Sequence, residues 1–189
     1  METRDDIHVI EKVLAGDTAA FASLVNRHKD LVFNIAMNIC RNREDAEEVA
    51  QDTFVKAFQK LGSFRKESRF STWLYRIAYN EAISMVRKSR LTTVALEEEI
   101  TEAMPEEDVE TEIAGMDTGE QKTVVRKILA RLPETDRVLV TLYYMDNQPV
   151  SEISAITGLG ESNVKVRLHR IRKKLYKELE AFISKKNFV

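Results

Sequence analysis

Residues 64–87 combine aromatic rings and positive charges in a way that suits single-stranded nucleic acid. A basic loop that opens with Phe64, Arg65 and Lys66 leads into a predicted helix. Aromatic rings interleaved with cations can stack on unpaired bases and bind the phosphate backbone. Ordinary core packing of the aromatic side chains is the alternative that spacing alone leaves open. At 100° per residue, one face of the helix carries Trp73, Arg76, Asn80, Ser84 and Arg87.

The opposite face of this helix is apolar and predicts a core beneath it. Leu74, Ala78, Ala82 and Met85 share that face. Three further amphipathic patterns precede it, over residues 7–14, 17–40 and 44–61, with Gly16 and Asp17 predicted as a stop and an N-cap. In the first pattern, Ile7, Ile10, Val13 and Leu14 fall on one side. Because no β alternation occurs anywhere in the chain, we expect an all-α protein.

The segment from 71 to 78, STWLYRIA, with Asn80 shortly after it, resembles the promoter-melting region of the bacterial extracytoplasmic-function (ECF, group IV) sigma factors. The similarity extends over nearly the whole chain. Lys66 lies where relatives often carry glycine. The resemblance implies that recognition and melting of the promoter −10 element involve Phe64, Arg65, Lys66, Arg69, Phe70, Trp73, Arg76, Asn80 and Arg87.

The predicted helix at 44–61 has an acidic face opposite its apolar stripe. Without context, such a face is typically solvated. Residues 45–54, DAEEVAQDTF, however, resemble the sigma-factor helix that docks on the clamp helices of the polymerase β′ subunit. A basic protein partner at this face is electrostatically reasonable, because acidic groups would repel phosphate. The resemblance implies docking through Glu48, Gln51, Asp52 and Val55.

The charges of the chain are strongly segregated. Residues 1–90 hold 15 Lys and Arg against 13 Asp and Glu, and residues 121–189 hold 14 against seven. Residues 91–120 hold 11 acidic residues and no basic ones. A segment so charged, interrupted by Pro105, is unable to collapse on its own. We therefore predict a flexible acidic linker there, and the overall charge of −2 says little about nucleic-acid binding.

The end of the chain follows a helix-turn-helix plan. An apolar stripe runs from about Gln121 to Leu132, and Pro133 stops that helix and begins the next. A turn at 146–149, a short helix at 150–157, a second turn at 158–160 and a basic helix from 161 to about 182 follow. In the basic helix, one face carries Val164, Leu168, Ile171 and Leu175. Seven of the 14 residues from 164 to 177 are Lys or Arg, which fits major-groove entry better than a merely solvated face.

This segment also resembles the family, in its domain that reads the −35 element. LPE at 132–134, EI at 152–153, VK at 164–165 and RLHR at 167–170 carry the resemblance. Gly160 and Val166 lie where serines are usual, so the N-cap is weaker and an apolar contact, such as one to a thymine methyl group, replaces a hydroxyl contact. The implied −35 contacts are Ser162, Asn163, Lys165, Val166, Arg167, His169, Arg170, Lys173 and Lys174.

The combined prediction is an all-α protein of two small helical domains joined by the acidic linker, the second a helix-turn-helix. Residues 1–90 would form sigma region 2, 91–120 the linker and 121–189 sigma region 4. The resemblance implies a promoter-specific initiation subunit whose partners are core RNA polymerase, through the β′ clamp helices and the β flap, promoter DNA and an anti-sigma factor. A conventional helix-turn-helix regulator with an N-terminal sensing or dimerisation domain is the alternative.

Other classes of protein are disfavoured by what the sequence lacks. No P-loop, catalytic carboxylate pair or nucleophile-base spacing occurs, so we expect no enzyme and no cofactor. The three histidines show no metal-site spacing. No run approaches the roughly 20 apolar residues of a membrane span, which predicts a cytoplasmic protein. Cys40, in an apolar setting, is expected to be a buried thiol rather than a redox sensor.

Overall fold

The computed structural model describes residues 2–93 and 131–186, and every regular element in those two ranges is a helix. This confirms the predicted all-α fold of two helical domains. Helix α4 (Phe70–Thr93) ends the first described range. The rest of the predicted acidic linker, and most of the helix expected from about Gln121, lie outside the described residues.

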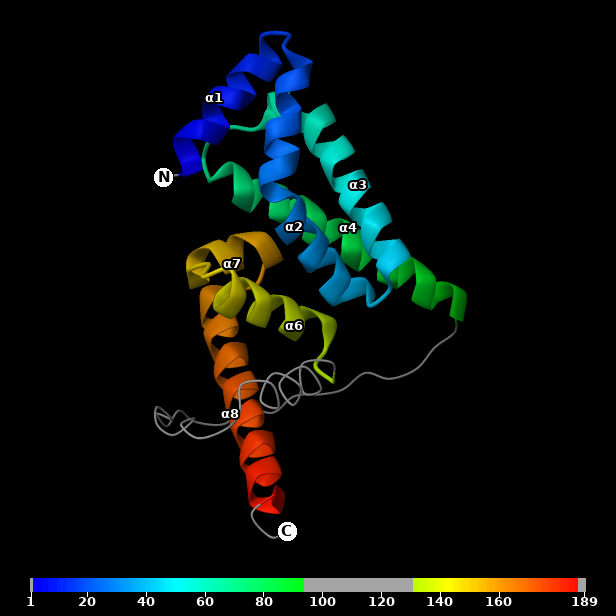
Figure 1. Ribbon diagram of the computed structural model, residues 1–189, viewed down its shortest axis with the longest axis vertical. Helices are drawn as coiled ribbons and strands as arrows, with labels where there is room; N and C mark the ends of the chain where they lie inside the picture. The colour runs from blue at the N-terminus through cyan, green and yellow to red at the C-terminus, as the bar shows by residue number, and fades with distance from the viewer. Residues whose placement is uncertain (1, 94–130, 187–189) are drawn as a thin grey trace.

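The first domain contains α1 (Glu2–Leu14), α2 (Phe21–Cys40), α3 (Arg43–Lys60) and α4 (Figure 1). Short 3₁₀ turns, Thr18–Ala20 and Leu61–Ser63, precede α2 and follow α3. The Asp17 side chain accepts a hydrogen bond from the Ala20 amide at 3.2 Å, as expected of an N-cap. The Asn42 side chain accepts one from the Glu44 amide at 2.8 Å, so polar residues between α2 and α3 end one helix and begin the next.

The apolar stripes of these helices meet in a common core. Ile10, Leu24, Ile35 and Leu74 are fully buried there. The prediction for Leu14 is wrong, because this side chain is 56% exposed. Leu14 is the last residue of α1, and the chain turns away at Gly16, whose φ of 110° is one that glycine adopts readily. The buried face therefore ends at Val13, one residue earlier than the periodicity predicts.

The second domain contains α6 (Glu134–Val140), a π-helical turn at Thr141–Met145, α7 (Val150–Thr157) and α8 (Glu161–Lys186). Pro133 occupies the N-cap of α6, and Gly158 ends α7 in the left-handed conformation at φ 76°. Leu139, Ile153 and Val164 are completely buried between the helices. The predicted helix-turn-helix is confirmed, and α8 extends four residues beyond its expected end.

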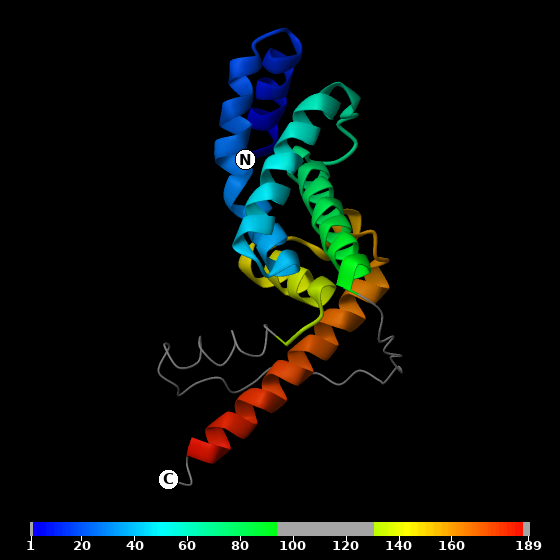
Figure 2. The same ribbon diagram turned by 90° about the vertical axis from the view of Figure 1, so that its right-hand side faces the viewer.

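The two domains are packed against each other rather than held apart. Helix α7 lies on α4 and α6 lies on α2 (Figures 1 and 2). Buried apolar side chains from both domains form one continuous core cluster. We call this contact between the domains the seam. No local feature of the sequence predicted it.

Hydrogen bonds from arginine side chains fasten one end of the seam. Arg137 of α6 is 4% exposed and donates from Nε to the carbonyl oxygen of Asn38 on α2, at 2.6 Å. Its Nη1 donates to the Leu132 carbonyl oxygen at 2.6 Å, and Arg41 donates to the same oxygen at 3.1 Å. Burial, with the nearby charge of Arg41, lowers the pKa of Arg137, while Glu134 opposes this change. Within the described residues, Nη2 of Arg137 has no hydrogen-bond partner.

Candidate nucleic-acid interface

Helix α4 separates its two faces as the periodicity predicts. Leu74, Ala78 and Ala82 are completely buried, and Tyr75 and Tyr79 join them at 6% and 9% exposure. Arg76, Asn80 and Arg87 are exposed on the other side, where Trp73 is half-buried. The polar groups of this face are therefore presented to solvent on a helix that is fixed by its buried side.

Three aromatic rings form a cluster where the loop meets α4. The Trp73 ring lies 5.4 Å from the Phe64 ring and 5.7 Å from the Phe70 ring, and the two phenylalanine rings are 5.7 Å apart. Phe70 is only 1% exposed, whereas Phe64 and Trp73 are half-buried. Phe70 thus supports the other two rings from below, and they offer the surface on which a base can stack.

The three cations of the loop, Arg65, Lys66 and Arg69, are exposed, and two of them form ion pairs within the protein. Lys66 has a left-handed backbone, with φ 59°, which explains why glycine suits this position. Its Nζ donates to Glu11 of α1 at 2.7 Å. Arg69 lies 3.9 Å from the carboxylate of Glu152 on α7. Arg65 is exposed in the same loop. Two of the three loop cations are therefore paired with the protein's own carboxylates.

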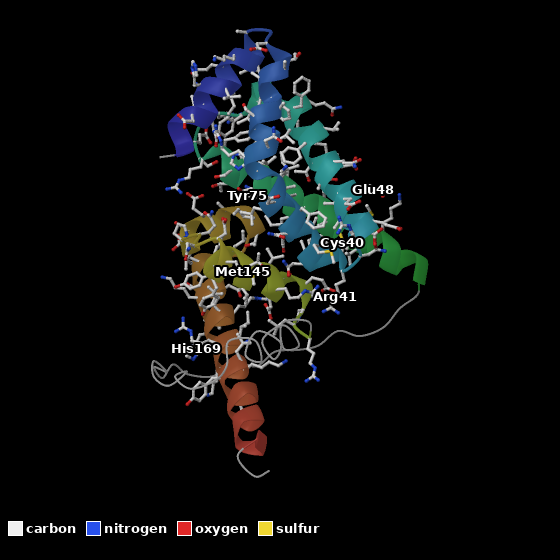
Figure 3. All side chains as sticks on the ribbon, viewed as in Figure 1. Cys40, Arg41, Glu48, Tyr75, Met145 and His169 are labelled. Carbon is white, nitrogen blue, oxygen red and sulfur yellow. The ribbon has the colours of Figure 1, made fainter. Side chains whose placement is uncertain are left out.

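Helix α3 presents its acidic face to solvent. All four of the predicted docking residues are exposed, and Val55, at 54%, adds an apolar group to the acidic surface. The opposite side is buried, with Ala46 and Ala57 at 0%. Figure 3 shows Glu48 on the outer side of α3, away from the helix bundle. The face is available to a partner without any rearrangement of the first domain.

Helix α8 carries its predicted contact residues with different degrees of exposure. The carbonyl oxygen of Gly160 accepts the first helical hydrogen bond, from the Val164 amide, so Gly160 is an N-cap without a side-chain acceptor. Val166 is 43% exposed. His169, labelled in Figure 3, and Arg170 are half-buried. Ser162, Asn163, Lys165, Lys173 and Lys174 are exposed.

Arg167 is held by contacts inside the second domain. Its Nη1 donates to Asp136 at 2.8 Å and its Nε donates to Asn163 at 3.1 Å. A base contact from Arg167 would have to replace or share the Asp136 carboxylate. The same ion pair ties the start of α8 to α6, so Arg167 also stabilises the helix-turn-helix.

Cys40, which was expected to be a buried thiol, is half-buried at the end of α2. Burial, with a smaller effect of the Asp45 charge, raises the pKa of its thiol to about 11. Among the described residues, no group of three or more potential ligands could hold a metal ion. In the same part of the chain, no helix combines the length and hydropathy needed to cross a bilayer.

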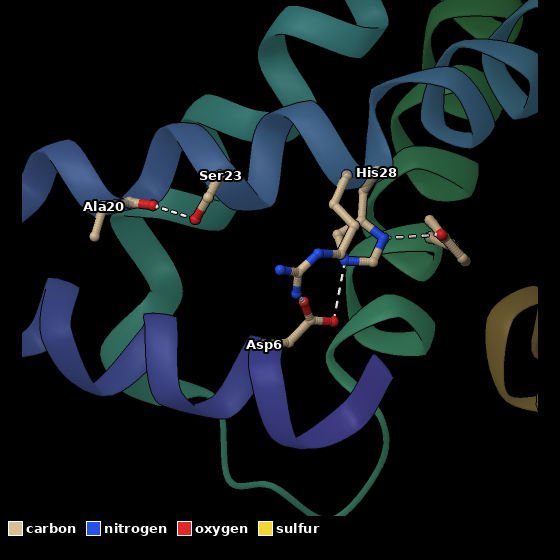
Figure 4. Close-up of polar contacts among 6 residues, drawn as sticks. Asp6, Ala20, Ser23 and His28 are labelled. Carbon is tan, nitrogen blue, oxygen red and sulfur yellow. Dashed lines mark hydrogen bonds and ion pairs between the residues drawn. The ribbon is translucent and has the colours of Figure 1, made fainter. Parts of the chain in front are cut away.

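A buried polar cluster that the sequence did not reveal joins α1, α2 and α4, with His28 and Asp6 at its centre (Figure 4). His28 of α2 is 4% exposed, and its Nε2 donates to Asp6 of α1 at 3.1 Å. A 3.0 Å hydrogen bond joins its Nδ1 to the hydroxyl group of Tyr75 on α4. Asp6 also accepts from Arg27. His28 lies four residues from both Leu24 and Val32, so its inward position was visible in the periodicity.

Asp6 remains a carboxylate in this cluster despite its burial. Burial acts to raise the pKa of Asp6, but hydrogen bonds and charges from His28 and Arg27 outweigh it and lower the pKa below the ordinary value. Thr72 is a second residue that the sequence did not reveal. Its hydroxyl group is buried in the seam and donates to Glu152.

Comparisons with known proteins give a consistent result for both domains. The sigma-70 region 2 family matches residues 24–92, and the sigma-70 region 4 family matches residues 122–175. The ECF RNA polymerase sigma factor SigW of Bacillus subtilis (strain 168) is 34% identical over 177 residues, which cover 90% of this chain and 94% of SigW.

Two solved structures share the fold. One is CnrH in complex with the cytosolic domain of CnrY, with 25% identity, a TM-score of 0.65, and coverage of 92% of this chain and 96% of the other. The second is the sigma factor RpoE in complex with the anti-sigma factor NepR from Bartonella quintana. It has 24% identity and a TM-score of 0.62, and the match covers 85% of this chain and 96% of the other.

Proposed function

The chain belongs to the family of ECF RNA polymerase sigma factors, and we propose that it binds core RNA polymerase and directs initiation at promoters with particular −10 and −35 elements. The observation that carries this proposal is the face of α4, where half-buried aromatic rings lie beside exposed cations. A duplex reader has little use for such a face, because the bases of a duplex are already stacked. Strand opening gives the aromatic rings bases to stack on.

The −10 element would be read in two ways by the first domain. Phe64 and Trp73 stack on unpaired bases, and Asn80 contacts base edges. Phe70 supports the two rings. Phosphate contacts, which position the strand without reading its sequence, come from Arg65, Lys66, Arg69, Arg76 and Arg87.

The −35 element would be read by α8 in the major groove. Lys165, Val166, Arg167, His169 and Arg170 face the bases, while Ser162, Asn163, Lys173 and Lys174 contact the backbone and the groove edge. Val166 offers an apolar contact to a thymine methyl group in place of a hydroxyl group. Because Arg167 is paired with Asp136, its contribution to specificity includes the cost of loosening that pair.

Core polymerase would bind the acidic face of α3 through its β′ clamp helices, with Glu48, Gln51, Asp52 and Val55 in the contact, and the second domain through its β flap. We assign residues 1–90 to region 2, 91–120 to the linker and 121–189 to region 4. The protein acts in the cytoplasm and catalyses no reaction itself, because the polymerase does. Since the sigma factor from Bartonella quintana was solved with an anti-sigma factor, a similar inhibitor is proposed here.

The packed domains must separate for this function. Elements centred near −10 and −35 are about 25 base pairs apart, or about 85 Å at roughly 3.4 Å per base pair. Helix α7 packs directly on α4, so the described arrangement places the two reading domains in contact. It therefore corresponds to a state that precedes promoter binding, and binding to core polymerase opens the seam.

Run-off transcription with purified core polymerase tests this function. Core enzyme is mixed with the protein and with fragments of the source genome, and transcripts are mapped by their 5′ ends. We expect discrete transcripts that depend on the protein and whose start sites share upstream −10 and −35 sequences. Transcription that stays unchanged when the protein is added would refute the proposal.

A further inference from the structure

A continuous series of contacts leads from the N-terminal helix to the aromatic surface of α4. The carboxylate of Asp6 accepts from the His28 ring at 3.1 Å, and the His28 ring lies edge-on to Phe70 with ring centres 5.6 Å apart. Phe70 in turn lies 5.7 Å from both Trp73 and Phe64. Asp6 is thus connected to the two half-buried rings through only two intervening side chains.

Hydrogen bonds at both of its ring nitrogens fix the orientation of the His28 ring. The Nε2 atom of His28 faces Asp6 and its Nδ1 faces the Tyr75 hydroxyl group, so both ring nitrogens are engaged and the ring is unable to rotate freely. An apolar side chain in the place of His28 would fill space but would fix no orientation. The imidazole plane therefore sets the plane against which Phe70 packs.

Helix α1 is also joined to the loop that carries Phe64. Its residue Glu11 accepts from Lys66 at 2.7 Å, and Ile10 and Val13 anchor the helix in the core. The region 2 family match begins at residue 24, so α1 lies outside it. The helix that fixes both the His28 ring and the loop is thus an element to which neither family match assigns a role.

We propose that Asp6 is a positioning residue for the −10 surface: through His28 and Phe70 it holds the rings of Trp73 and Phe64 in the arrangement on which unpaired bases stack. The role in DNA binding rests on the proposed function, whereas the positioning of the rings does not. Asp6 itself, 3% exposed, contacts no DNA.

The chain offers a direct reporter of this arrangement, because Trp73 is its single tryptophan. The full-length protein is prepared with Asp6→Ala, with Asp6→Asn, which keeps a carbonyl acceptor for His28, and with Asp5→Ala as an exposed matched control on the same helix. Acrylamide quenching of Trp73 fluorescence is measured on each folded protein. Binding of a fluorescein-labelled pool of random single-stranded DNA of about 12 nucleotides is measured for each protein in complex with core polymerase, which opens the seam, and is compared with core polymerase alone.

Asp6→Ala is expected to increase the quenching of Trp73 and to weaken binding of the DNA pool about fivefold. This factor corresponds to the lower end of the binding free energy that one stacked base contributes. Asp6→Asn should restore most of the wild-type quenching, and Asp5→Ala should match the wild type. If Asp6→Ala does not fold, His28→Phe takes its place, because it keeps a ring but removes both hydrogen bonds. Folded His28→Phe must then show the increased quenching.

Two outcomes separate this inference from the proposed function. Unchanged quenching in folded Asp6→Ala, or in folded His28→Phe, would overturn the positioning role even if the wild-type protein binds the DNA pool. Increased quenching in the variants together with no DNA binding by the wild type would support the positioning role and count against the −10 assignment.

Discussion

The seam between the domains predicts a measurable equilibrium between closed and open states. Thr72 of α4 is 3% exposed and donates its hydroxyl hydrogen to Glu152 of α7, whose side chain is 20% exposed. A polar pocket of about 380 Å³ lies between the domains, lined by residues of both that include Arg69, Tyr75 and Gln148, so the seam is not packed as tightly as a domain core. Replacement of Thr72 by Val keeps the volume and removes the donor.

The size of the effect follows from the state of Glu152. In Thr72→Val, the mostly buried carboxylate loses a charge-assisted hydrogen bond in the closed state, but it is hydrated in the open state. Such a bond contributes about 1.5–3 kcal/mol, and partial exposure of Glu152 favours the lower end. A change of about 1.5 kcal/mol shifts the ratio of closed to open molecules about tenfold.

Single-molecule energy transfer between dyes on the two domains measures this ratio. Exposed Gln59 and Lys177 are replaced by Cys in a Cys40→Ser background. Thr53→Val is the matched control, because Thr53 is a buried threonine whose hydroxyl group bonds within α3, at 2.7 Å from the Val49 carbonyl oxygen.

The open population should rise in Thr72→Val and stay at the wild-type level in Thr53→Val. In a Glu152→Ala background, Thr72→Val should have little further effect on the open population, because each change removes the same hydrogen bond between Thr72 and Glu152. An energy-transfer distribution for Thr72→Val that coincides with the wild type, or an equal shift in Thr53→Val, would refute the reasoning.

Three further predictions concern single groups. Because burial raises the pKa of Cys40 to about 11, its alkylation by iodoacetamide at about pH 7.5 should be much slower than that of a free thiol and should accelerate as the pH approaches that value. The depressed pKa of Asp6 stabilises the fold above about pH 4, and this contribution is lost as the pH falls through the folded-state value; the free energy of unfolding of Asp6→Asn, from urea titrations, should therefore depend less on pH in that range. Glu48→Lys with Asp52→Lys should weaken association with core polymerase in a pull-down while the circular dichroism spectrum stays unchanged, and normal association would mean that this face is only solvated.

Local patterns predicted the faces of individual helices, because burial of a stripe depends on a repeat that the sequence displays. Leu74, Ala78 and Val164 are buried as their periodicity indicated. The prediction that Leu14 is buried was wrong, because periodicity does not reveal where the end of a helix leaves the core. The helix boundaries at Asp17 and Pro133 were predictable because each has a local physical cause.

Contacts between residues far apart in the chain were not predictable, because no repeat or local motif in the sequence marks them. Arg137 and Asn38 are 99 positions apart, and nothing near either residue marks them as partners across the seam. His28 was visibly on an apolar face, but its partner Asp6 lies in another helix and was not identifiable from spacing. The pairing of Arg167 with Asp136 likewise depends on how α6 and α8 pack.

The central claim is that α4 opens promoter DNA by stacking on bases that it separates, and permanganate modification of unpaired thymines tests it most directly. Promoter fragments found by run-off transcription are incubated with core polymerase and with the wild-type protein, Trp73→Ala or Asn80→Ala. Loss of a stacked base costs about 1–3 kcal/mol, so both variants should lose permanganate reactivity near −10 while they retain closed-complex binding in a mobility-shift assay. Wild-type reactivity in both correctly folded variants would contradict the claim.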